Sequence, residues 1–311
     1  MRSIRLLLAT LASLTAAAVA VAGAQGSNQG DDAFRFKSGV ELVNVTATVS
    51  DDNGHFVTGL SKDDFEVFED GERQPITQFT NERVPVSVAV LLDVSDSMFG
   101  QRLIDARAAV ERFLFTRLDQ ADEFCVIAFN HEPRRLTPWT QSADLIREGL
   151  SGLRPSGATG LYDAVIAAMP MMERRSRERG ALLIISDGED TASDASMHDV
   201  RTALLRSDAF SYAIGIDPPA RRAINTGVNV SALNEITSGS GGSTEVVHDT
   251  ADLDGATARI ADALNKQYLL GYVSSRAPDG KYHSIRVRAV NSSYRVRARN
   301  GYVAARRPLA K

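Results

Sequence analysis

The sequence predicts an α/β fold with a doubly wound, mainly parallel sheet (the Rossmann-like arrangement), flanked by a small β-sandwich. Apolar runs alternate with helical patterns from residue 84 to residue 266, which is the order that builds a parallel sheet. Two of these runs, residues 88–92 and 181–186, are apolar without alternation and are therefore expected to be buried on both faces. The segments on either side alternate with a period of two instead, which is typical of strands with one wet face.

The N-terminus has the pattern of a secretion signal. Two arginines precede an apolar run over residues 6–22, and the small residues at its end fit cleavage after Ala22 or Ala24. We therefore expect residues 1–24 to be a signal peptide and the mature protein to be secreted or periplasmic, in the cell envelope, with no transmembrane span. An uncleaved anchor is the alternative, because the apolar run is just long enough to cross a bilayer.

The two flanks of the α/β region are expected to form one unit. Residues 25–39 are polar and rich in glycine, as in a linker, and residues 40–83 then alternate between apolar and polar side chains. Residues 267–303 alternate in the same way. Neither flank alone could bury its apolar face, so we expect the two to pair in a β-sandwich. The α/β domain, residues 84–266, would be inserted between its halves, with residues 304–311 as a tail.

Within the α/β region, strands are expected where apolar residues run together and helices where they recur every three or four positions. The expected strands are residues 88–92, 123–129, 135–139, 181–186, 209–216 and 243–247. The expected helices are residues 102–118, 143–150, 161–179, 197–205, 230–237 and 252–266. Pro170 should kink the third helix. The charged residues 173–179 are interpreted as its solvated end rather than as a phosphate-binding patch.

Oxygen-bearing side chains follow the first buried strand. Asp93, Ser95 and Ser97 are spaced by one residue each, in the loop beyond the strand's carboxyl end, where open α/β sheets place ligand sites. One carboxylate and two hydroxyls offer the hard oxygen ligands that Mg²⁺ binds in octahedral geometry. The alternative is that the two serines cap the helix that follows.

The spacing Asp93-x-Ser95-x-Ser97 resembles the opening motif of the metal-ion-dependent adhesion site (MIDAS) of von Willebrand factor type A (VWA) domains. The resemblance implies two further metal ligands, Thr159 in a glycine-rich loop and Asp187 after the second buried strand. It implies Mg²⁺, or else Mn²⁺ or Ca²⁺, as the cation. It also implies adhesion in which an Asp or Glu carboxylate of a partner protein binds the metal. The flanks look like those of secreted bacterial proteins related to this family.

Composition and motifs argue against other functions. The chain of 311 residues is 43% hydrophobic, enough for a sizeable core, and its formal charge of −4 without a basic block argues against nucleic acid as a partner. Cys125 is the single cysteine, so no intramolecular disulfide can form, and its apolar neighbours identify it as a core side chain. The sequence has no nucleophile elbow, P-loop or Rossmann glycine pattern, and its five histidines lack zinc spacing, so no enzyme is expected.

Two other interpretations stay open beside the binding protein. One is a structural scaffold whose metal only stabilises the fold. Metal-dependent binding of a partner would argue against this scaffold. The other is a metal-dependent hydrolase that uses Asp93 and Asp187, which ester turnover would support. Glu189, Asp190 and Asp194 crowd the loop after Asp187. We interpret them as a solvated acidic loop rather than a second cation site.

Overall fold

A computed structural model describes residues 41–217, 227–276 and 278–304 of the chain. The expected signal peptide and linker, residues 1–24 and 25–39, lie outside the described residues, as does all but the first residue of the expected tail. In the described part of the chain, no helix is both long enough and apolar enough to cross a membrane.

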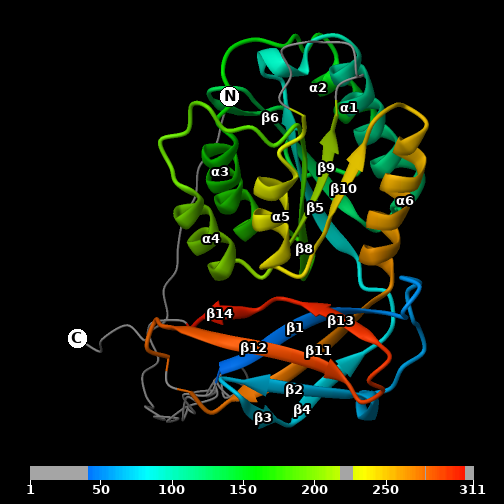
Figure 1. The fold of residues 1–311 in the computed structure, drawn as a ribbon, viewed down its shortest axis with the longest axis vertical. Helices are drawn as coiled ribbons and strands as arrows, with labels where there is room; N and C mark the ends of the chain where they lie inside the picture. The colour runs from blue at the N-terminus through cyan, green and yellow to red at the C-terminus, as the bar shows by residue number, and fades with distance from the viewer. Residues whose placement is uncertain (1–40, 218–226, 277, 305–311) are drawn as a thin grey trace, which may run out of the picture. The chain divides into compact units, whose positions relative to one another are not determined.

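A six-stranded sheet forms the centre of the α/β region (Figure 1). Its strand order is β10-β9-β8-β5-β6-β7, and all neighbouring pairs are parallel except β6 with β7. The strands are β5 (Val86–Asp93), β6 (Glu123–Phe129), β7 (Pro133–Arg135), β8 (Arg179–Ser186), β9 (Phe210–Ile216) and β10 (Thr244–Val247). Every residue of β5, β6, β8 and β9 is buried, which explains their apolar sequences without alternation. Cys125 in β6 is a core side chain as expected, and burial raises the pKa of its thiol to about 12.

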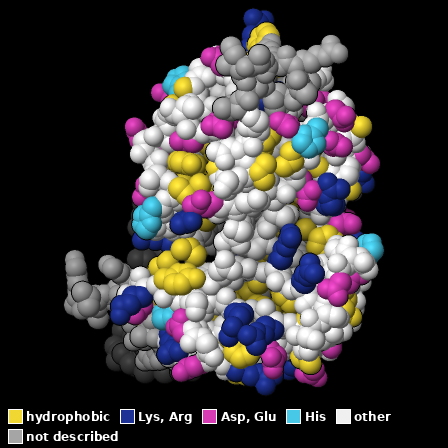
Figure 2. All heavy atoms as spheres, in the orientation of Figure 1, with side chains coloured by type: hydrophobic (Ala, Val, Ile, Leu, Met, Phe, Trp, Pro, Cys, Tyr) yellow, Lys and Arg dark blue, Asp and Glu magenta, His cyan; other side chains and the backbone are white. Residues whose placement is uncertain are grey.

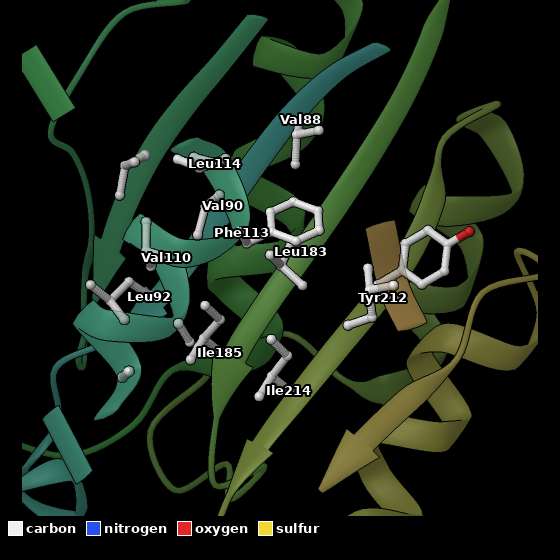
Figure 3. Close-up of a cluster of buried hydrophobic side chains, with 14 of the residues drawn as sticks. Val88, Val90, Leu92, Val110, Phe113, Leu114, Leu183, Ile185, Tyr212 and Ile214 are labelled. Atoms are coloured by element: carbon white, nitrogen blue, oxygen red, sulfur yellow. The ribbon is translucent and has the colours of Figure 1, made fainter. Parts of the chain in front are cut away.

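Helices cover both faces of this sheet. One face carries α1 (Gln101–Arg112), α2 (Ala143–Leu150) and α6 (Asp252–Asn265), and the other carries α3 (Leu161–Glu173), α4 (Met197–Arg206) and α5 (Val230–Ser238). Successive side chains of β5 enter two different cores. Val88, Val90 and Leu92 pack with α1 and α6, whereas Ala89 and Leu91 pack with α3, α4 and α5. Figure 3 shows the first three side chains together with Val110 of α1. The prediction of a doubly wound, mainly parallel sheet is confirmed.

Two four-stranded antiparallel sheets form the β-sandwich from the flanks of the α/β region. Their strand orders are β13-β1-β11-β4 and β14-β12-β2-β3, so each sheet combines strands from both flanks. The N-terminal strands are β1 (Glu41–Ser50), β2 (Phe65–Glu69), β3 (Glu72–Gln74) and β4 (Ile76–Thr80). The C-terminal strands are β11 (Gln267–Ser274), β12 (Tyr282–Ala289), β13 (Arg295–Ala298) and β14 (Gly301–Val303). The predicted sandwich, built from N-terminal and C-terminal segments, is confirmed.

The alternation in the sequence decides which side chains face the sandwich core. In β12, Ile285 and Val287 are buried, whereas Arg286 and Arg288 point outward. The two guanidinium groups lie 5.2 and 5.4 Å from the centre of the Phe68 ring, which is cation–π distance. Figure 2 shows Lys and Arg side chains over the β-sandwich end of the visible face, interspersed with acidic ones. The outer face is therefore wet and of mixed charge.

A buried carboxylate joins the two sheets of the sandwich. Glu69, at the end of β2, is fully buried. It accepts hydrogen bonds from the hydroxyl groups of Ser274 (2.9 Å) and Tyr272 (3.2 Å) in β11, and of Tyr302 (2.8 Å) in β14. Three hydroxyl donors from two sheets thus satisfy a carboxylate that would otherwise be unfavourable in a core.

A single arginine ties the α/β sheet to both segments that connect it with the sandwich. Arg179, the first residue of β8, is buried. Its guanidinium donates to the carbonyl oxygens of Val84 (2.7 Å) and Leu264 (2.7 Å) and to the side chain of Gln267. Val84 lies just before β5 and Leu264 near the end of α6. The entry and the exit of the inserted region are therefore held by one side chain.

Two predicted boundaries are wrong. The third helix, α3, ends at Glu173, so residues 173–179 are not its solvated end. Arg175 instead donates to the Met172 carbonyl (2.9 Å) and pairs with Asp208 (2.7 Å). The strand β8 then begins at Arg179. The edge strand expected over residues 135–139 is β7, which pairs with the end of β6 and is finished by Arg135.

Candidate metal centre

The loops that carry the predicted ligands meet at the carboxyl edge of the central sheet, which is the upper edge in Figure 1. Asp93 ends β5, and Asp187 follows the last residue of β8, the direct neighbour of β5 in the sheet. The backbone N–H of Asp96 donates to the carbonyl of Gly157 (2.9 Å), which joins the loop after β5 to the loop that carries Thr159.

A second set of hydrogen bonds joins the loop of Thr159 to the loop of Asp187. The backbone N–H of Thr191 donates to the carbonyl of Thr159 (2.8 Å), and the N–H of Thr159 donates to the Thr191 hydroxyl (3.0 Å). All five predicted residues therefore belong to one hydrogen-bonded cluster of three loops.

Asp93 is a fully buried carboxylate. Its Oδ1 accepts the backbone N–H of Ser95 (2.8 Å) and its Oδ2 accepts the Ser186 hydroxyl (2.6 Å). Burial raises the pKa of Asp93 from 3.8 to about 6, with a smaller contribution from the nearby charge of Asp187, because these hydrogen bonds only partly offset the loss of water. Among the described residues, no cationic side chain pairs with Asp93. It is therefore an anion at neutral pH that lacks a counter-charge from the described protein.

The hydroxyl groups of the motif are not used for helix capping. The N-cap residues are Gly100 for α1 and Gly160 for α3, and neither has a side chain that could cap its helix. The alternative in which Ser95, Ser97 and Thr159 cap these helices is therefore wrong.

The two serine hydroxyls have a separation that suits a magnesium ion. Ser95 Oγ and Ser97 Oγ are hydrogen-bonded to each other and lie 3.0 Å apart. Adjacent oxygens around Mg²⁺ are about 3 Å apart, because each lies about 2.1 Å from the ion along perpendicular directions. No three Asp, Glu, His or Cys side chains of the described residues converge as a ligand set. A cation here would therefore depend on hydroxyl and water oxygens beside two carboxylates, a donor set of the hard-oxygen type that fits Mg²⁺.

Asp187 is paired with an arginine that the sequence analysis missed. Arg102, the second residue of α1, is 6% exposed. Its Nη1 donates to Asp187 Oδ2 (3.0 Å) and to the carbonyl oxygen of Ser97 (2.7 Å). One signal could have found it, since cations are unfavourable in the first turn of a helix, where the helix dipole is positive. A buried arginine there needs an anionic partner.

The acidic loop after Asp187 is only partly solvated. Asp194 is exposed, as expected, but Asp190 is half-buried. Asp190 accepts the backbone N–H of Tyr162 (3.2 Å), in the first turn of α3, and the hydroxyl of Ser193 (2.6 Å). Asp190 thus holds the loop onto α3 rather than facing solvent.

Known proteins resemble parts of this chain. The family model described as von Willebrand factor type A domain matches residues 88–189, a range that includes all five candidate residues. Inter-alpha-trypsin inhibitor heavy chain H4 of Sus scrofa is 26% identical over 151 residues, which are 44% of this chain and 16% of that protein. Minor fimbrium subunit Mfa5 of Porphyromonas gingivalis is 26% identical over 162 residues, 50% of this chain and 13% of that protein. The chain thus spans less than a fifth of the length of these curated relatives.

A solved structure shares the fold over most of the chain. It is a von Willebrand factor type A protein from Catenulispora acidiphila, with a TM-score of 0.51 and 12% identity. The match covers 87% of this chain and 75% of that one. At this identity the likeness concerns the fold alone.

Proposed function

Because the chain contains a von Willebrand factor type A domain, we propose that it binds a partner protein through a Mg²⁺ ion held at the candidate centre. The separation of Ser95 Oγ and Ser97 Oγ, 3.0 Å, carries this proposal. The two hydroxyls would bind the ion directly and Thr159 would enter from the opposite loop. Asp93 and Asp187 would act directly or through water.

The charge balance of the centre favours binding of an anionic group. Asp93 and Asp187 together only offset the charge of a divalent ion, because the three hydroxyl ligands are neutral. The ion therefore stays electrophilic toward a further oxygen ligand, and when bound it would supply a coordination position for a partner's Asp or Glu carboxylate.

The surface beside the centre suits a protein partner. Phe99, two residues after Ser97, is 66% exposed, and Ile104 in α1 is 59% exposed. Exposed apolar side chains next to a polar site are typical of protein–protein interfaces, in which apolar contacts surround a few charged ones.

We place this function outside the cytoplasm. The secretion-signal pattern over residues 1–24 supports this location. One relative, which matches half of this chain, is named as a minor fimbrium subunit, and this name also supports a location outside the cytoplasm. N-terminal sequencing of the mature protein should find a start after Ala22 or Ala24, and an intact N-terminus on an exported protein would favour the anchor instead.

Acidic peptides test the proposed binding. We expect an array of peptides that carry Asp or Glu to bind the protein in Mg²⁺, and to lose binding in EDTA or when Asp and Glu are replaced by Asn and Gln. The double variant Ser95→Ala/Ser97→Ala removes two ligand oxygens without changing the net charge, so it should lose peptide binding. Ser292→Ala, in an exposed loop of the sandwich, is the control and should bind like the wild type.

Calorimetric titration with Mg²⁺ and Mn²⁺ separates the alternatives. A wild-type protein that takes up no cation at millimolar concentration would contradict the proposal. Uptake of a cation without any peptide binding would instead support the structural scaffold, in which the metal only stabilises the loops.

A further inference from the structure

Arg102 is held in place by the candidate centre itself. The two hydrogen bonds of its guanidinium go to the carboxylate of Asp187 and to the backbone carbonyl of Ser97. Both acceptors belong to residues of the predicted ligand set. The positive charge of Arg102 therefore lies 3.0 Å from an oxygen that a metal ion would also use.

The rest of the guanidinium is poorly satisfied. Nε and Nη2 of Arg102 are buried and have no hydrogen-bond partner among the described residues. Buried N–H donors of a charged group normally have partners, so this arrangement is weaker than a fully bonded arginine. The side chain also lies in the first turn of α1, where the helix dipole disfavours a cation. The attraction of Asp187 thus has to outweigh two unfavourable effects.

A divalent ion and this guanidinium exclude each other electrostatically. With Arg102 in place, one of the two anionic charges of the centre is already neutralised. A cation bound beside Asp187 would also lie within a few ångströms of the guanidinium, in a buried site where repulsion is only weakly screened.

We propose that Arg102 is a tethered competitor for the cation, so that the guanidinium and the metal use Asp187 in turn. This rests on the proposed metal-dependent function and adds its regulation. Metal binding then requires the Arg102 side chain to leave Asp187 for solvent. Because the guanidinium competes for Asp187, the affinity for the cation is lower than five oxygen ligands alone would give. The fraction of protein that holds a cation therefore rises and falls with the cation concentration in the surrounding solution.

Arg102→Met tests the competition, because methionine keeps an unbranched apolar stem and removes the charge. We expect the affinity for Mg²⁺ and Mn²⁺, measured by calorimetry on the full chain, to rise about 10- to 100-fold. Arg112→Met is the matched control, since it makes the same substitution near the end of the same helix, where Arg112 is partly exposed and contacts Asp254 at 3.8 Å. It should change the affinity by less than about twofold. Equal affinities for the Arg102→Met protein and the wild type would overturn the proposal.

A second measurement uses the wild type alone, so it does not depend on the folding of a variant. Phenylglyoxal modifies exposed arginines, and peptide mass spectrometry reports the extent at Arg102. We expect Arg102 to be protected in EDTA and to become reactive at saturating Mg²⁺. Protection in both conditions, in a protein that binds the cation, would refute the competition and leave the proposed function standing. If only the Arg102→Met protein binds a cation, the competition is supported while the metal-dependent function of the wild type fails.

Discussion

Asp93→Asn should weaken Mg²⁺ binding by about a hundredfold and, in the metal-free protein, raise the free energy of unfolding by up to about 3 kcal/mol at pH 7. The first effect follows because asparagine keeps the shape of the side chain but removes one of the two carboxylates at the centre. The second follows because ionising the buried Asp93 is unfavourable. Its pKa rises from 3.8 to about 6 on folding, and each pH unit corresponds to about 1.4 kcal/mol.

The difference in the free energy of unfolding between the two proteins depends on pH. The folded-state pKa of Asp93 lies above the unfolded one, so the wild type is relatively favoured at low pH and loses that advantage as the pH rises from about 4 to about 6. We therefore expect the two proteins to be almost equally stable near pH 4 and to differ near pH 7. Urea unfolding in EDTA measures the stability and calorimetry measures Mg²⁺ binding.

The matched control is Asp144→Asn, because the Asp144 side chain is 95% exposed and lies at the start of α2. It should change neither quantity appreciably. Undiminished Mg²⁺ binding by a folded Asp93→Asn protein would argue against the centre, and a loss of stability at pH 7 would argue against the buried, unpaired anion.

Arg179→Ala should lower the free energy of unfolding by about 2–4 kcal/mol. The change leaves the carbonyls of Val84 and Leu264 without their donor, and a buried acceptor without a partner costs about 1–3 kcal/mol. Burial lowers the pKa of Arg179 to about 10, so the guanidinium is still charged at neutral pH and its hydrogen bonds are of the strong, charge-assisted kind. Thermal and urea unfolding followed by circular dichroism measure the loss.

Arg174→Ala is the control for this second prediction. Arg174 belongs to the same charged stretch but is exposed, so its removal should change stability by less than about 0.5 kcal/mol. If both variants were equally stable, Arg179 would not hold the two connecting segments together.

The fold was predictable where the residues of one segment alone show which of its faces are buried. The apolar run over residues 88–92 lies in a strand buried on both faces, and the alternation of β12 places Arg286 and Arg288 outward. The boundary of α3 was not predictable in this way. The charged residues after Glu173 have the composition of a solvated helix end, and only the approach of Val84 and Leu264 makes Arg179 a buried donor. Those partners lie 95 and 85 residues away in sequence.

The candidate centre was likewise predictable only in part. Asp93 and Asp187 could be assigned to one edge because each follows a buried strand, and parallel neighbours end on the same side of a sheet. The pairing of Arg102 with Asp187 depends on how α1 lies against β8, and these residues are 85 positions apart.

The insertion of the α/β region into the sandwich also sets the order in which a newly made chain can be completed. The backbone N–H of Leu60 bonds to the hydroxyl of Tyr268, which lies 208 residues later, and β1 obtains its neighbours β11 and β13 only from the last part of the described chain. The strands and helices of the α/β region between them make contacts over shorter sequence distances, so these contacts can form before the C-terminal strands are synthesised. During synthesis β1 therefore emerges first and pairs last, with both of its edges open to other chains until the C-terminal strands arrive.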